Sequence, residues 1–266
     1  MPAKTYKLFD KEYTSSFEKL FDDYDELETL PLTHKQDWYS ATEILQEGKI
    51  KVTPCDVFEN ENLIYYFYGK PSYVVSEKIG SRGDSVYFPV CFVIRFDSVK
   101  VEKVFPFDSG AFAEKMFYGF FHKKMNLHQF SLKPNIHQIK GLIKTFFGNN
   151  NNYYRSISVV RFEDFENEEV KSYVNLINNK GEESFDERNS SIEIISKSDL
   201  TLKDNIIAII LPSDIAETDK SIENLRKQGA EIITYDTFGG NPGAYNSVIR
   251  QYLYDFLKNK GAFKIK

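Results

Sequence analysis

A glutamate inside an apolar segment is the residue of this sequence best suited to chemistry. Glu193 lies within the run Ser191–Ile195 and has an isoleucine on either side. In a β-strand, Ile192 and Ile194 point to one face and Glu193 points to the other. A carboxylate at the centre of a strand that faces a cleft can bind a ribose hydroxyl or stabilise a growing positive charge. A solvated strand face is the alternative interpretation of the same pattern.

Two further segments place polar side chains at the ends of apolar stretches. The aromatic run Leu63–Tyr68 ends at Gly69, and Lys70 follows it, where its cation could face a phosphate or a developing negative charge. Thr33 and His34 end a short apolar stretch and directly precede a helical pattern. A core strand with a surface lysine at its turn, and simple capping of the helix by Thr33 or His34, are the alternatives.

The elements that position these residues follow from the hydrophobic periodicity. It predicts helices over residues 14–30, 36–46 (closed by Gly48), 111–148 (broken near Pro134), 168–178, 218–228 and 245–258. It predicts strands over residues 30–33, 63–68, 87–96, 99–105, 192–196, 206–211 and 231–235. Because the elements interleave irregularly and not as regular βαβ units, an α+β fold is favoured. No repeat or linker divides the sequence, so residues 1–266 are expected to form one domain.

Composition narrows the class of protein. The net charge of -5 argues against a protein whose main task is to coat nucleic acid. Cys55 and Cys91 are too few for a secreted disulfide framework. The longest apolar runs, such as Ile206–Leu211, are far shorter than the roughly 20 residues of a membrane span. We therefore expect a cytoplasmic protein without a membrane partner.

Several common active-site patterns are absent from the sequence. The histidines are not spaced as zinc ligands and have no cysteine partners, so no metal site is expected. There is no GxSxG nucleophile elbow. The glycine-rich stretch Phe238–Gly243 lacks the Lys-Ser/Thr of a phosphate-binding loop, and we expect it to be a turn.

Taken in order, the three polar segments resemble the ADP-ribosyltransferase superfamily, and within it most nearly the DarT-type DNA-modifying toxins. The opening strand and helix of that family are similar to Leu32-Thr33-His34 and Ile44-Leu45-Gln46-Glu47-Gly48. Its aromatic strand, followed by an Arg-Ser pair and a tyrosine, is similar to Tyr66-Phe67-Tyr68, Lys70, Ser72 and Tyr73. Its strand with the catalytic glutamate is similar to Ser191-Ile192-Glu193-Ile194-Ile195.

The resemblance implies a split antiparallel β-sheet core with flanking helices. It also implies an enzyme that cleaves the nicotinamide–ribose bond of NAD⁺ and transfers ADP-ribose to a macromolecular acceptor, as a toxin or defence effector. Carried over by position, it implies catalytic roles for Glu193 and Lys70. It implies contacts with NAD⁺ for a set of four residues: Thr33, His34, Tyr68 and Tyr73.

The sequence departs from the family at two points. The opening helix is longer than in those toxins. Lys70 stands where the family carries a catalytic arginine, and a lysine keeps the charge but loses the bidentate fork. The stretch Val104–Phe112 and the last sixty residues have no counterpart in the family. An NAD⁺ glycohydrolase and a non-catalytic interaction protein therefore stay open as alternatives.

The resemblance favours nucleic acid over protein as the acceptor. Because nucleic-acid affinity rests largely on neutralising phosphates, such an enzyme needs a local basic track whatever its total charge. A solvated helix face is the alternative interpretation of lysines in this part of the sequence. The candidates for the track are Lys78, Arg82, Lys115, Lys123, Lys124 and Lys133.

Overall fold

The computed structural model describes residues 5–21, 24–72, 85–179, 187–238 and 241–264. Three residues singled out from the sequence, Tyr73, Lys78 and Arg82, lie outside these ranges.

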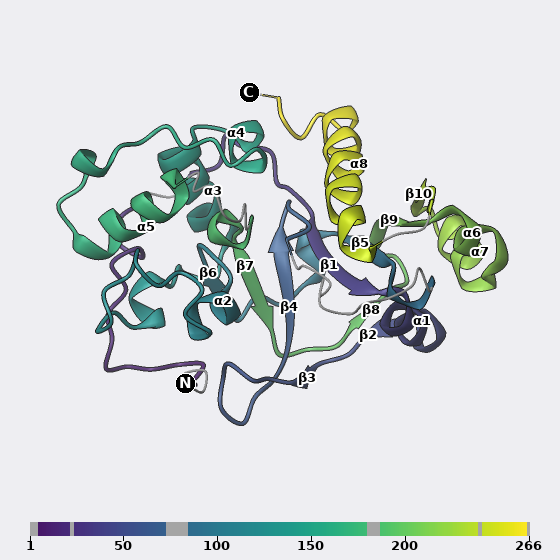
Figure 1. Cartoon of the computed structure of the whole chain (residues 1–266), viewed down its shortest axis with the longest axis horizontal. Coiled ribbons are helices and arrows are strands. Elements are labelled where there is room, and N and C mark those ends of the chain that lie inside the picture. The colour runs from purple at the N-terminus through teal and green to yellow at the C-terminus, as the bar shows by residue number, and fades with distance from the viewer. Residues whose placement is uncertain (1–4, 22–23, 73–84, 180–186, 239–240, 265–266) are drawn as a thin grey trace.

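An eight-stranded sheet runs through the middle of the molecule (Figure 1). Its strand order is β10-β9-β5-β1-β4-β7-β6, with β3 paired to β4, and β2 and β8 form a separate pair. The pairs are antiparallel except for β9 and β10, which run parallel. The strands are β1 (Leu32–Asp37), β2 (Lys49–Ile50), β3 (Thr53–Pro54), β4 (Asn62–Tyr68), β5 (Pro89–Ile94), β6 (Lys103–Phe105), β7 (Glu193–Ser196), β8 (Leu200–Thr201), β9 (Ile206–Pro212) and β10 (Glu231–Tyr235).

Helices gather at both ends of the sheet. In Figure 1, α2 to α5 lie beyond β6 and β7, α6 and α7 lie beyond β9 and β10, and α8 stands beside β5 and β9. None of the helices in the described ranges is long and apolar enough to cross a membrane. The helices are α1 (Trp38–Glu47), α2 (Ser109–Ala113), α3 (Ile136–Phe147), α4 (Asn150–Tyr154), α5 (Glu168–Asn178), α6 (Ser213–Thr218), α7 (Lys220–Lys227) and α8 (Tyr245–Asn259).

Alternation along β5 divides the core into two clusters. Phe92 packs in the larger cluster, which holds many of the aromatic rings, whereas Cys91 and Val93 pack in a second cluster with Ile249 and Leu253 of α8. Successive side chains of a strand point to opposite faces, so one strand supplies both clusters. The buried central strands thus give a rigid frame for the polar side chains that interrupt them.

The α+β class expected from the sequence is confirmed, with a mostly antiparallel sheet and flanking helices. Gly48 ends α1 in the left-handed conformation, with φ of 66°, as its position after the helical pattern predicts.

The helix expected over residues 14–30 is wrong for the described part of that segment, which consists of turns and bends. Phe17 and Leu30 are fully buried there, and the Ser15 hydroxyl accepts the backbone N–H groups of residues 17 and 18. Tertiary burial and a side-chain turn therefore replace the helix.

The sheet is split between β1 and β4. These strands pair at two positions, Leu32 with Tyr68 and Thr33 with Phe67, although β1 pairs with β5 along all six of its residues. Beyond Thr33 the two strands diverge, and β3 joins the other end of β4. The separation leaves room between two central strands for a pocket.

Candidate active site

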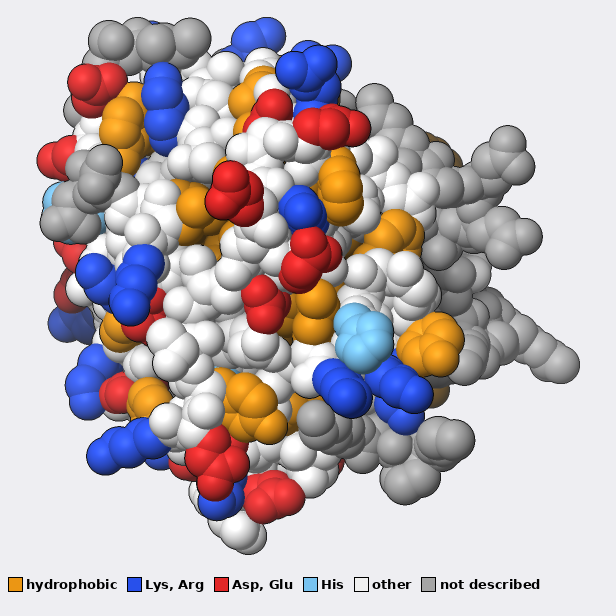
Figure 2. All heavy atoms as spheres, turned by 90° about the vertical axis from the view of Figure 1, so that its left-hand side faces the viewer, with side chains coloured by type: hydrophobic (Ala, Val, Ile, Leu, Met, Phe, Trp, Pro, Cys, Tyr) orange, Lys and Arg blue, Asp and Glu red, His pale blue; other side chains and the backbone are white. Residues whose placement is uncertain are grey.

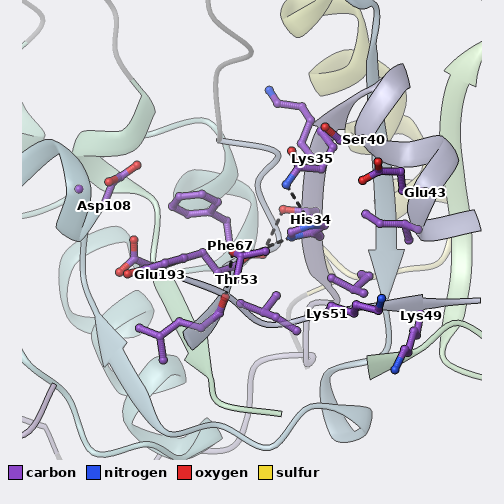
Figure 3. Close-up of a pocket in the computed structure, with 18 of the residues that line it drawn as sticks. His34, Lys35, Ser40, Glu43, Lys49, Lys51, Thr53, Phe67, Asp108 and Glu193 are labelled. Carbon is purple, nitrogen blue, oxygen red and sulfur yellow. Dashed lines mark hydrogen bonds between the residues drawn. The ribbon is translucent and has the colours of Figure 1, made fainter. Parts of the chain in front are cut away.

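A pocket of about 610 Å³ occupies the split. Its walls come from β1, β4, α1 and the start of α2, and Glu193 of β7 closes one end. Figure 3 shows Glu193 and Asp108 together at that end, His34 in the middle, and Glu43, Lys49 and Lys51 toward the other end. A volume of this size suits a small-molecule ligand or cofactor.

Glu193 is held at its end of the pocket by its neighbours in the sheet. It pairs with Phe67 of β4 and Phe105 of β6, and its side chain is 2% exposed. One carboxyl oxygen, Oε2, accepts the backbone N–H of Ser109 at 3.1 Å, and Oε1 has no hydrogen-bond partner among the described residues. Burial, reinforced by the charge of Asp108, raises the pKa of Glu193 well above its ordinary value. A buried carboxyl with an unused oxygen is costly, and such groups are typical of functional sites.

Asp108 is a second carboxylate of the pocket, and sequence reasoning missed it. It is 8% exposed and caps α2, accepting the Ala111 N–H at 2.8 Å through Oδ1. It precedes Ser109, the residue that holds Glu193, so the chain itself brings the two carboxyl groups together. The helix-capping pattern Asp-Ser-Gly-Ala was the available signal, but nothing in it points toward Glu193, 85 residues later.

His34 lies at the split itself. Its Nδ1 is 3.0 Å from the carbonyl oxygen of Tyr65, and its Nε2 is 3.2 Å from the amide nitrogen of Gln36. Because a carbonyl only accepts, Nδ1 carries the proton and Nε2 accepts from Gln36. Burial lowers the pKa of His34, which favours this neutral tautomer. The ring therefore bridges β1 and β4 as a neutral polar group in the pocket wall.

Thr33 also lines the pocket, but its hydroxyl is engaged with the backbone. Its Oγ1 lies within hydrogen-bond distance of the carbonyl oxygens of Phe67, at 3.2 Å, and Lys70. A hydroxyl has one proton to donate, so Thr33 serves first to join β1 to the turn after β4.

Lys70, the other residue expected to be catalytic, lies outside this pocket. It is 0% exposed; its ammonium contacts Ser156 Oγ at 3.0 Å and both the carbonyl and hydroxyl oxygens of Ser190 at 3.1 Å. It also lies 4.4 Å from the centre of the Tyr153 ring. Burial, then the charge of Arg250, lowers the pKa of Lys70 well below its usual range. Its donors are used inside the protein, as expected of a structural lysine.

Of the two tyrosines expected to contact NAD⁺, Tyr68 is turned away from the pocket. Tyr68 is 0% exposed, packs in the core and accepts the Leu30 N–H at 2.8 Å, so it does not face the pocket. The alternation that sends Tyr68 inward sends Tyr65 and Phe67 to the pocket wall. Tyr73 falls outside the described residues. Tyr65 and Phe67 are therefore the aromatic rings of β4 that a ligand can meet.

A second pocket, of about 630 Å³, lies at the far end of α2. Gly110 of α2 lines the first pocket, and Phe112 and Ala113 line the second. Of the lysines proposed to contact nucleic acid, Lys115 and Lys123 line this second pocket, together with aromatic side chains such as Tyr118. On the face shown in Figure 2, acidic and basic side chains are interspersed, and several basic ones gather beside a histidine.

Within the described ranges, no three His, Cys, Asp or Glu side chains are grouped as metal ligands.

The far end of the first pocket is lined by Lys49 and Lys51, which the sequence did not single out. Each is paired with a carboxylate, Lys49 with Asp199 at 3.1 Å and Lys51 with Glu47 at 2.5 Å. The positive charges at this end are therefore already balanced within the protein.

No family model and no curated protein matches the sequence. A search of solved structures finds Thermus sp. 2.9 DarT in complex with carba-NAD⁺. The two chains are 11% identical, the alignment covers 80% of this chain and 97% of that one, and the TM-score is 0.39.

Proposed function

We propose that this chain is an NAD⁺-dependent ADP-ribosyltransferase and that Glu193 is its catalytic carboxylate. The observation that carries the proposal is the state of Glu193: buried on a central strand, held by one N–H, and facing a pocket with its other oxygen unpartnered among the described residues. The resemblance of the sequence motifs to that superfamily agrees with this role.

The chemistry suits a single carboxylate of this kind. Cleavage of the bond between nicotinamide and ribose passes through an oxocarbenium-like state, as glycoside cleavage does. A carboxylate that accepts the ribose 2′-hydroxyl stabilises the positive charge that grows on the sugar. The cationic nicotinamide ring and the new hydrogen bond both favour the ionised form of Glu193, so ligand binding lowers its raised pKa.

The rest of the pocket can hold the dinucleotide. We assign the nicotinamide ribose to the Glu193 end, with Tyr65 and Phe67 as ring surfaces and His34 as a polar contact at the split. The far end then takes the second nucleoside, because the cations of Lys49 and Lys51 there are each already paired with a carboxylate. Lys70 has a structural role in this proposal, and Thr33 acts by holding the two strands together.

Nucleic acid is our proposed acceptor, ahead of protein. The second pocket offers aromatic surfaces for a base and the cations of Lys115 and Lys123 for phosphate, next to the helix that leads to Asp108. The mixed charges of Figure 2 predict a short contact rather than a long track along the strand.

The test is incubation of the protein with NAD⁺ labelled in its adenine portion, with and without single-stranded DNA, RNA or cell protein. Label on a macromolecule supports transfer, and the labelled class identifies the acceptor. Free ADP-ribose alone identifies an NAD⁺ glycohydrolase. An absence of both, together with no thermal shift at NAD⁺ concentrations that should stabilise a binder by about 2.7 kcal/mol, leaves the non-catalytic interaction protein.

A further inference from the structure

Asp108 raises a question that the proposed role of Glu193 leaves open: what receives the proton of the acceptor. When ADP-ribose is transferred, the attacking atom must lose a proton, and Glu193 is already engaged with the ribose hydroxyl in our proposal. A second group within the same pocket can act as the base. The acidic end of the pocket holds one, the carboxylate of Asp108 (Figure 3).

The backbone places the two carboxyl groups at the same end of the pocket. The N–H that binds Glu193 belongs to Ser109, the residue after Asp108, and both carboxyl groups line the same pocket. Both are at least nine-tenths buried, at 2% and 8% exposure. The charge of Asp108 adds to burial in raising the pKa of Glu193, so the two groups interact electrostatically.

The contacts around each carboxyl group distinguish the role of Asp108 from that of Glu193. Asp108 accepts the Ala111 N–H at 2.8 Å, and such a bond favours its ionised form. Glu193 sits deeper, on the sheet, where burial opposes its charge. Asp108 also lies at the start of α2, whose Phe112 and Ala113 reach the second pocket, so it stands on the side from which an acceptor bound there approaches.

We infer that Asp108 is a second catalytic carboxylate, the base that takes the proton from the attacking atom of the acceptor while Glu193 holds the ribose. This inference rests on the proposed function. The bond between the ribose C1′ and nicotinamide breaks, and its electron pair leaves with nicotinamide, which becomes neutral. The attacking atom forms its bond to C1′ and passes its proton to Asp108. Where water is the nucleophile, the same step gives ADP-ribose.

Two described side chains that face this pair, Tyr65 and His34, do not replace it. Tyr65 of β4 has a pKa raised by burial first and then by Glu193, so it stays protonated. His34 of β1 carries its proton on Nδ1 toward a carbonyl. The backbone carbonyl of Arg188, next to β7, accepts the Asp108 N–H at 3.1 Å, which fixes the backbone of the aspartate from a third side.

The experiment compares Asp108→Asn with a matched capping aspartate. Asparagine keeps the cap, because its amide oxygen accepts the Ala111 N–H, and removes the base. Asp37 caps α1 through Ser40 at 2.8 Å and does not line the pocket, so Asp37→Asn is the control. In single-turnover transfer assays, Asp108→Asn is expected to be about 100-fold to 10,000-fold slower, and Asp37→Asn unchanged. The NAD⁺-induced thermal shift should persist in both variants.

Two further readouts separate a base from a structural cap. Serine also caps helices, so Asp108→Ser should keep α2 in place while removing the carboxylate. Added formate should then restore part of the rate by supplying a carboxylate. In Asp108→Asn, the acid limb of the kcat/KM profile should move to lower pH, because Glu193 loses its charged neighbour.

Each outcome decides the inference. A wild-type rate and an unmoved profile in Asp108→Asn would overturn the role of Asp108 and leave the proposed function standing. Slow turnover with a lost NAD⁺ shift and no rescue by formate would make Asp108 a structural cap. If the wild-type protein cleaves no NAD⁺ at all, the proposed function and this role fail together.

Discussion

Glu193 and Lys70 are two buried charged residues close together in the fold, and they differ in what surrounds them. Lys70 follows Phe67, the strand partner of Glu193, by three residues. Around Lys70, two serines and a carbonyl meet the ammonium group, whereas Glu193 keeps one oxygen without a partner among the described residues and faces a pocket. Burial and a shifted pKa are common to both. Unused hydrogen-bonding capacity next to a pocket is what distinguishes a candidate catalytic group from a structural one.

The sharpest way to break this comparison is Glu193→Gln. The amide keeps the shape of the side chain but cannot carry the charge that stabilises the oxocarbenium state, so NAD⁺ cleavage should fall by roughly 100-fold to 1,000-fold. Labelled-NAD⁺ turnover measures the loss, and circular dichroism checks the fold. A folded Glu193→Gln protein that keeps most of its activity removes Glu193 from catalysis.

The stability of Glu193→Gln relative to the wild type should increase as pH rises. A carboxyl whose pKa is raised in the folded state contributes stability that is complete below its unfolded pKa, near the ordinary value of 4.5, and is lost as pH rises toward the folded value. Glutamine does not titrate, so Tm of Glu193→Gln minus Tm of the wild type should grow from pH 4.5 to neutral pH. Thermal melts across that range measure the difference, and a constant difference would mean that Glu193 is ionised in the free protein.

Variants of Lys70 test the other side of the comparison. Lys70→Ala leaves a cavity and should cost about 2–5 kcal/mol, and Lys70→Arg, which adds volume to a filled site, about 1–3 kcal/mol. Lys70→Met keeps most of the volume, and Ser156 and Ser190 still bond each other at 2.9 Å, so it should lose least. Denaturant unfolding ranks the three. Unchanged NAD⁺ cleavage per folded Lys70→Met molecule fits a structural lysine, and its loss would restore Lys70 to the catalytic set.

His34 lines the same pocket as Glu193, but both of its ring nitrogens already have partners. Replacing it should therefore lower activity less than replacing Glu193 does. His34→Ala removes one neutral polar contact, worth about 1 kcal/mol, and with it the bridge to the Tyr65 carbonyl. We expect a higher KM for NAD⁺ with little change in kcat, together with a smaller NAD⁺ thermal shift. A fall in kcat as large as that of Glu193→Gln would give His34 a part in the chemical step.

The smallest effect should come from the second pocket. Replacing Lys115 and Lys123 with alanine should lower the slope of oligonucleotide affinity against salt by about one for each phosphate that is no longer neutralised. Lys227 and Lys260 are exposed lysines at the other end of the sheet and are the matched controls. Binding without salt dependence, or equal slopes in both pairs of variants, would favour a protein acceptor.

The sequence predicted the elements better than the contacts between them. Periodicity located most strands and helices, and the interruption of an apolar strand by Glu193 identified the residue that faces the pocket. The helix over residues 14–30 failed because its apolar side chains are buried by rings distant in the sequence, such as those of Phe130 and Tyr173 around Phe17. Local pattern carries no information about such partners.

The expected site residues that lie outside the pocket have a related explanation. Lys70 and Tyr68 follow the aromatic strand, and no spacing within that strand reveals that Ser156 and Ser190 enclose the lysine or that Tyr68 caps the backbone of Leu30. Asp108 lies in a stretch with no counterpart in the resembling family, and only the fold brings it to Glu193. Residue type can therefore suggest a chemistry, but long-range packing decides which residues of that type lie in the active site.

The short pairing of β1 with β4 has a mechanical consequence. Two residue pairs, Leu32 with Tyr68 and Thr33 with Phe67, join the half of the sheet that carries α8 to the half that carries Glu193. We expect this joint, to which the Thr33 hydroxyl and the His34 ring add, to resist twisting less than the six-residue pairing of β1 with β5, and the pocket lies between the two halves. A dinucleotide that contacts both halves of the sheet would hold them together and reduce their relative motion. Amide hydrogen exchange in β1 and β4 should then slow together when NAD⁺ binds, and the protein would become stiffer across its middle without any change in its outline.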